Sequence, residues 1–80
     1  MTFEQFKATR RHVADVGAAT GIDLGPDVQP GHVYDSDLHI FDMPDGRHLL
    51  VIFNEQTVSA DLTELERKLY AFASDEDMFR

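Results

Sequence analysis

The chain has 80 residues, of which 42% are apolar and 28% are charged, a composition typical of a small globular domain. It has no cysteine, which excludes disulfide bonds, thiolate metal sites and cysteine nucleophiles. Its net charge of −8, from 15 acidic against 7 basic residues, argues against direct binding to nucleic acid or to an anionic membrane, because both need a basic surface. No apolar run approaches the roughly 20 residues that span a bilayer, and the first residues lack the features of a signal peptide, so we expect one soluble, cytoplasmic domain over residues 1–80.

The first predicted element is a helix over residues 3–16. Thr2 is a good N-cap, and Gln5 three residues later completes a capping box that satisfies two free backbone N–H groups. Apolar residues recur near helical spacing along this segment: Phe3, Phe6, Val13 and Val16. Residues 17–31 follow with four of the five glycines and two of the three prolines, and we expect them to form a loop.

An antiparallel hairpin is the clearest local signal in the chain. Alternating apolar runs flank Pro44-Asp45-Gly46, where Pro44 presets φ and Gly46 supplies the positive φ that a three-residue loop with a bulge requires. Weaker strand patterns precede and follow this hairpin. The predicted strands cover about residues 32–36, 38–43, 47–53 and 56–60, which together form a meander of three or four strands.

The last predicted element is a helix over residues 62–74. Asp61 is a suitable N-cap, and Glu64 lies at the third helical position, where its charge favours the positive end of the helix dipole. A single apolar stripe runs along this helix: Leu62, Leu65, Leu69 and Phe72. With residues 75–80 as a frayed tail, the predicted fold class is α+β, with an N-terminal helix, an antiparallel β-meander and a C-terminal helix.

Both faces of the predicted hairpin are apolar. One face carries Leu38, Ile40, Leu50 and Ile52, with Asp42 opposite His48 at the loop end. The other carries four cross-strand pairs: Met43–Arg47, Phe41–Leu49, His39–Val51 and Asp37–Phe53. Two short helices can cover only one face of so small a sheet. The second face therefore needs a cover from residues 17–31, from a second copy of the chain or from a partner.

One stretch has a spacing found among metal ligands: His32, Asp35, Asp37 and His39. On a continuous strand Asp35, Asp37 and His39 would share one side, and two carboxylates with one imidazole suit zinc, manganese or iron. The same residues are equally typical of a turn, and no second motif accompanies them. A small metal-binding protein is therefore an alternative, and we assign no metal ligand.

Asp42 and His48 are predicted cross-strand neighbours. A carboxylate beside an imidazole favours the charged form of the imidazole, as in a pH-sensitive pair. No nucleophile lies near them in the hairpin, so a small acid–base or metal-dependent enzyme is only a further alternative. We assign no catalytic residue and no cofactor, and we do not expect an enzyme.

The negative charge is concentrated in the middle of the chain. Residues 13–46 contain seven aspartates and no lysine or arginine, and Asp75-Glu76-Asp77 adds a second acidic group. The leading hypothesis is a non-catalytic protein-binding domain that covers a basic, nucleic-acid-binding surface of a larger protein or nucleoprotein complex. By analogy of class, phage-type inhibitors such as anti-CRISPR and anti-restriction proteins act in this way. The predicted contact residues are acidic or aromatic: Asp23, Asp27, Tyr34, Asp35, Asp37, Phe41, Asp42, Asp45 and Phe53.

Two other interpretations of the same features remain open. A homodimer with a structural or housekeeping role would bury the second apolar face by pairing two copies of the sheet. An acidic surface can also serve only to keep a small protein in solution, without any partner.

Overall fold

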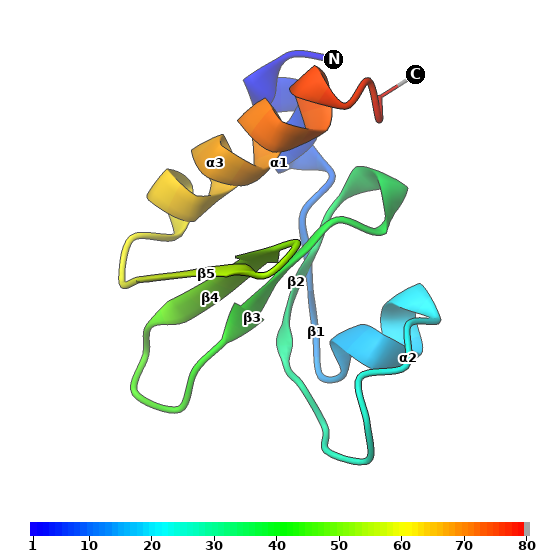
Figure 1. The fold of residues 1–80 in the computed structure, drawn as a ribbon, viewed down its shortest axis with the longest axis vertical. Helices are drawn as coiled ribbons and strands as arrows, with labels where there is room; N and C mark the ends of the chain where they lie inside the picture. The colour runs from blue at the N-terminus through cyan, green and yellow to red at the C-terminus, as the bar shows by residue number, and fades with distance from the viewer. Residues whose placement is uncertain (80) are drawn as a thin grey trace.

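The sheet is built from strands that neighbour one another in the sequence. The computed structural model describes residues 1–79 and contains five antiparallel strands in the spatial order β1-β2-β3-β4-β5 (Figure 1). The strands are β1 (Arg11–Val13), β2 (Gly31–Val33), β3 (His39–Asp42), β4 (His48–Ile52) and β5 (Glu55–Ser59). The predicted α+β class is confirmed, with five strands in the meander instead of three or four.

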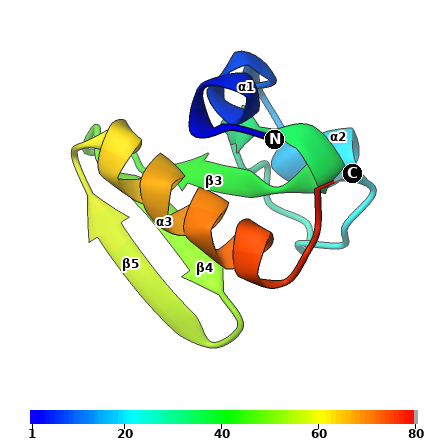
Figure 2. The same cartoon turned by 90° about the horizontal axis from the view of Figure 1, so that it is seen from above.

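Helices lie on both sides of the sheet. They are α1 (Phe3–Ala8), α2 (Val16–Thr20) and α3 (Leu62–Asp75), with a 3₁₀ turn η1 (Asp35–Asp37) between β2 and β3. α3 crosses one side of the sheet with α1 beside it, and we call this side the inner face; α2 lies against β2 on the opposite, outer face (Figures 1 and 2). None of the helices in residues 1–79 has the length and apolar character that crossing a membrane requires.

The predicted helix over residues 3–16 is wrong in its second half. Its capping box is present, with hydrogen bonds of 3.1 and 2.8 Å between Thr2 and Gln5. Thr9 then ends the helix, because its hydroxyl donates to the Phe6 carbonyl at 2.7 Å and competes with continued helical bonding. The residues that follow form β1 and pair with β2, so tertiary strand pairing overrides a weak helical preference.

The segment predicted as a loop, residues 17–31, includes most of α2 and folds back over the outer face. Gly21 ends α2 with a φ of 75°. Val16, the first residue of α2, packs against Gly31 in β2, where a Cβ would lie 2.9 Å from a Val16 methyl carbon and would collide with the Ile40 carbonyl. Part of the outer face is therefore covered by this chain itself, the first of the three covers considered above.

The central hairpin has the predicted register. Phe41 lies opposite Leu49, and Asp42 lies opposite His48. Gly46 closes the loop with a φ of 87°, in the left-handed region that the three-residue loop requires. β3, β4 and β5 each match their predicted strand to within one residue at both ends.

Positive φ angles end one of the predicted strands early. The strand predicted over residues 32–36 stops at Val33, because Ser36 and Asp37 in η1 have φ angles of 62° and 59°, a conformation that a strand does not contain. By contrast, α3 matches the helix predicted over residues 62–74 and extends it by one residue.

The tail predicted as frayed over residues 75–80 is packed in the part that the structure describes. The Met78 amide donates to the Ala73 carbonyl at 2.9 Å, which closes the end of α3. The side chains of Met78 and Phe79 pack against the core. Arg80 lies outside the described residues.

The main core lies between α3 and the inner face, and α1 completes it. Its buried residues are Phe6, Tyr34, Leu38, Ile40, Leu50, Leu65, Leu69 and Ala73. One carboxylate is enclosed with them: Glu66 Oε2 accepts hydrogen bonds from the Tyr34 hydroxyl at 2.8 Å and from the Arg10 guanidinium at 3.1 Å. Burial and this hydrogen bond raise the pKa of the Tyr34 hydroxyl, which therefore keeps its proton as the donor.

The close packing at Gly31 predicts that Gly31→Ala lowers the free energy of unfolding by about 3 kcal/mol, because backbone and side-chain neighbours both have to move. Gly46→Ala is the control, since nothing lies within 4 Å of the added Cβ and only the positive φ is unfavourable. Its cost should be about 1 kcal/mol. Urea unfolding followed by circular dichroism measures both values. Equal losses in the two variants would contradict the close packing of Val16 and β3 around Gly31.

Candidate functional site

Four polar side chains converge on the inner face, one from each of four adjacent strands. His12 comes from β1, His32 from β2, Asp42 from β3 and His48 from β4. The register places His12 opposite His32 and Asp42 opposite His48. His32 also lies opposite Ile40, which shares its face of β3 with Asp42. We call these four residues the histidine cluster.

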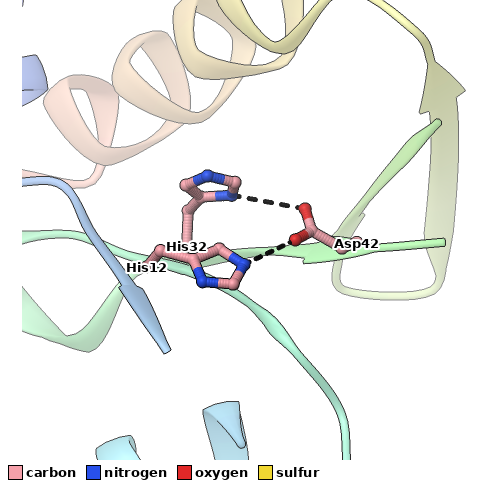
Figure 3. A group of neighbouring side chains, drawn as sticks. All are labelled: His12, His32 and Asp42. Carbon is pink, nitrogen blue, oxygen red and sulfur yellow. Dashed lines mark hydrogen bonds and ion pairs between the residues drawn. The ribbon is translucent and has the colours of Figure 1, made fainter. Parts of the chain in front are cut away.

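Asp42 lies at the centre of the histidine cluster, and both of its carboxylate oxygens are in use. His12 Nε2 donates to Oδ2 at 2.9 Å, and His48 Nδ1 donates to Oδ1 at 2.9 Å. His32 Nδ1 lies 3.4 Å from Oδ1, within ion-pair range but without hydrogen-bond geometry, so this buried nitrogen has no hydrogen-bond partner. Figure 3 shows the rings of His12 and His32 pointing toward the Asp42 carboxylate.

The surroundings shift the pKa values of two members of the cluster. Burial lowers the pKa of His32 below its ordinary value of 6.5 and outweighs the Asp42 carboxylate, which acts in the opposite direction. Three neighbouring basic side chains add to the effect of burial: His12, Arg10 and His48. Burial alone would raise the pKa of Asp42, but hydrogen bonds from His12 and His48 hold it below its ordinary value. Near neutral pH the site therefore combines an ionised carboxylate with a neutral imidazole.

The metal-like group predicted from spacing does not form. Asp35 and Asp37 lie in η1, and His39 Nδ1 donates to the Asp37 carbonyl at 3.0 Å instead of facing two carboxylates. The positive φ of Asp37 interrupts the continuous strand that the spacing requires. A different group of three residues within 1–79 does bring its possible ligand atoms within 4.8 Å of one another: His12, His32 and Asp42.

Sequence reasoning finds only half of the histidine cluster. The contact between Asp42 and His48 follows from the hairpin register and is confirmed at 2.9 Å. The helix predicted over residues 3–16 places His12 outside the sheet, so the pairing of His12 with His32 could not be predicted. A usable signal does exist, because both histidines stand at the centre of a three-residue strand and both precede a valine.

The predicted contact residues do not form one surface. Tyr34 is excluded, because its side chain is 4% exposed and its hydroxyl is bonded to Glu66 in the core. Asp42 belongs to the histidine cluster, and Asp45 forms an ion pair with Arg47 at 2.7 Å in the hairpin loop. The remaining acids lie in two places. Asp23 and Asp27 are exposed in the segment between α2 and β2, which lies at the opposite end of the molecule from η1 and the end of α3 (Figure 1).

The structure brings two acidic segments together near the end of α3. The Ser36 hydroxyl donates to the Met78 carbonyl at 3.2 Å, which joins η1 to the chain after α3. The carboxylates of these two segments are Asp35, Asp37, Asp75, Glu76 and Asp77, and we call them the acidic end. Asp75, Glu76 and Asp77 lie in or directly after the last turn of α3, at the negative end of the helix dipole, where their charges lower stability and no basic residue of that turn offsets them.

Phe53 lies in the turn between β4 and β5 and is the most exposed large apolar side chain in residues 1–79. Its side chain is 81% exposed, and its ring meets Phe72 of α3 edge-on with 5.5 Å between centroids. Its φ is 53°, a left-handed conformation that bulky residues rarely adopt. The predicted pairing of Phe53 with Asp37 on the outer face is wrong, because both residues leave their strands. Phe53 instead contacts Phe72, which lies one helical turn before Asp75 in α3.

The outer face is open over β4 and β5. α2 packs against β2, and Val51 and Val58 remain 39% and 41% exposed. Leu49 lies opposite Val58 on this face, and both Leu49 and Phe41 are half-buried. β5 is also the last strand of the sheet, so its outer backbone groups have no strand partner within the described residues. The cover expected from outside the chain is therefore needed over this half of the sheet only.

The lowered pKa of His32 predicts that the domain loses stability as the pH falls below about 6.5. The unfolded chain binds this proton more readily, so the stabilisation is complete above the unfolded-state pKa and is lost as the pH falls through the lower folded-state pKa. Urea unfolding between about pH 7.5 and 5 should show a larger loss for the wild type than for His32→Gln. Parallel pH profiles would contradict the burial of a neutral imidazole at this position.

Three features of the described residues are candidate sites: the histidine cluster, the acidic end with Phe53, and the open half of the outer face. No family model matches the chain, and neither a curated protein nor a solved structure matches it.

Proposed function

We propose that this chain is a non-catalytic, cytoplasmic protein-binding domain that covers a basic, nucleic-acid-binding surface of a larger protein. The observation that supports the proposal is the acidic end together with Phe53, an aromatic side chain that is 81% exposed and whose ring contacts Phe72, one helical turn before Asp75. Aromatic side chains are the usual anchors of protein interfaces, and carboxylates around them select a basic partner.

Each part of this surface lowers the stability of the free domain. Three carboxylates of the acidic end, Asp75, Glu76 and Asp77, lie at the negative end of the α3 dipole, where their charge is unfavourable. Phe53 leaves most of its ring in water, and its left-handed backbone costs about 1 kcal/mol relative to glycine. Features that lower stability without improving packing are typical of functional surfaces.

A basic partner would compensate these costs. Lysine and arginine side chains would neutralise the acidic end, and an apolar pocket would remove the Phe53 ring from water. Carboxylates and phosphates bind the same guanidinium and ammonium groups, so the domain would compete with nucleic acid for the partner. Competition of this kind is inhibition by occlusion and needs neither a catalytic residue nor a cofactor.

A homodimer is the second candidate, and the open half of the outer face favours it. Val51 and Val58 are exposed there beside β5, an edge strand to which a second copy could add its own β5. A species of twice the chain mass in light scattering supports this function. A monomer at about 100 μM, in the range where weak dimers form, excludes it.

Two charge-matched variants test the acidic end. Asp35→Asn/Asp37→Asn removes two of its carboxylates, whereas Asp23→Asn/Asp27→Asn removes two from the segment between α2 and β2. In capture from a nuclease-treated lysate of the source organism, the wild type and the second variant should retain a basic protein. The first variant should lose it, and high salt should release it from the wild type.

Phe53→Gly tests the aromatic anchor in the same capture experiment. It should lose the basic protein while its free energy of unfolding stays within about 1 kcal/mol of the wild type, because glycine accepts the positive φ and offsets the lost contact with Phe72. Capture that is equal in all variants contradicts the proposal. A captured protein that still binds an oligonucleotide in the complex contradicts inhibition by occlusion.

A further inference from the structure

We propose that the histidine cluster binds one Zn²⁺ ion, with His12 Nε2, His32 Nδ1 and a carboxylate oxygen of Asp42 as its protein ligands. This site is independent of the proposed partner-binding surface, because it shares no residue with the acidic end or with Phe53. Its ligands come from β1, β2 and β3, so a bound ion would bridge three adjacent strands.

The distances between the ligand atoms suit a small ion. Zinc lies about 2.0–2.1 Å from nitrogen and oxygen ligands, so the ligand atoms of a tetrahedral site are about 3.3 Å apart. In the histidine cluster His12 Nε2 lies 2.9 Å from Asp42 Oδ2, and His32 Nδ1 lies 3.4 Å from Asp42 Oδ1. One possible ligand atom from each of the three residues lies within 4.8 Å of the other two. The His12 side chain is 59% exposed and has room to turn toward the ion.

The unpaired ring nitrogen of His32 indicates a ligand that the protein itself does not provide. His32 Nδ1 is buried and has no hydrogen bond, although buried polar atoms are nearly always paired. A cation between His32 and Asp42 would give this nitrogen the partner that the protein does not supply.

His48 holds the carboxylate in position. Its Nδ1 donates to Asp42 Oδ1 at 2.9 Å, and its side chain is only 18% exposed. A hydrogen bond to the free oxygen of a ligating carboxylate is the outer contact that metal sites use to orient a ligand. His48 is therefore a positioning residue, which leaves Oδ2 directed toward His12.

The donor set determines which ions fit. Two imidazole nitrogens and one carboxylate oxygen suit Zn²⁺ and neighbouring first-row ions, whereas Ca²⁺ and Mg²⁺ prefer oxygen ligands throughout. Three protein ligands leave a fourth tetrahedral position for water.

Zinc titration of the whole chain at about pH 7.5 tests the site, since protonation of the histidines would weaken binding at lower pH. Calorimetry should give one Zn²⁺ per chain, and the melting temperature should rise by about 10–20 °C when free Zn²⁺ is at a hundred times the Kd. Co²⁺ should give the visible absorption of a four-coordinate ion. Amide hydrogen exchange in β1 should slow, because the ion would attach this edge strand to its neighbours.

The chain provides a matched control for each type of ligand. His39→Ala removes a histidine that lies opposite Val33, outside the cluster, and Asp45→Asn removes an aspartate from the hairpin loop. Both should bind zinc as the wild type does. His12→Ala and Asp42→Asn should lose more than about 100-fold in affinity, beyond the roughly 10- to 100-fold expected for His48→Ala. The exposed position of His12 makes its variant the safest for folding.

Two results would overturn the zinc site. The first is folded wild-type protein that shows neither heat nor a melting shift with Zn²⁺. The second is equal zinc affinity in the ligand variants and the two controls, which would place the ion elsewhere on the chain. Loss of affinity confined to the cluster variants, together with slower exchange in β1, supports it.

Discussion

The pairing of β1 with β2 is the contact on which the rest of the structure depends. The chain enters this three-residue strand from α1 beside the inner face and leaves it toward α2 on the outer face (Figure 1). One short chain can therefore cover both sides of its sheet. The same pairing brings Arg10 to the buried carboxylate of Glu66 and places His12 opposite His32. The pairing of β1 with β2 also brings Val16, the first residue of α2, against Gly31.

Elements with local signals could be predicted closely, because caps and turns act over three or four positions. Asp61, the loop Pro44-Asp45-Gly46 and the apolar stripe of α3 need no distant partner, and their elements lie within one residue of the expected bounds. β1 could not be predicted in this way. Its three residues have no strand pattern of their own, and Val13 and Val16 happen to continue a helical spacing, so only pairing with β2 decides their structure.

In the candidate sites, too, only the contacts that depend on local sequence could be predicted. The hairpin register was enough to place Asp42 beside His48, but the other half of the histidine cluster requires the register of β1 on β2. The acidic end likewise depends on a contact between Ser36 and Met78, which are 42 residues apart. Charge patterning identifies which segments are acidic, and only the tertiary fold shows which of them meet.

Two side chains, Arg10 directly before β1 and His12 within it, hold this strand with different strength. Arg10 bonds to a carboxylate that is fully buried, so separating them would leave an unpaired charge in the core. His12 bonds to Asp42 with a side chain that is 59% exposed, where water competes for both partners. β1 should therefore open first at its Val13 end, the end farther from Arg10, and α2 follows that end directly. A ligand that secures His12 would also secure the cover that α2 provides, which couples the histidine cluster on the inner face to the exposure of apolar side chains on the outer face.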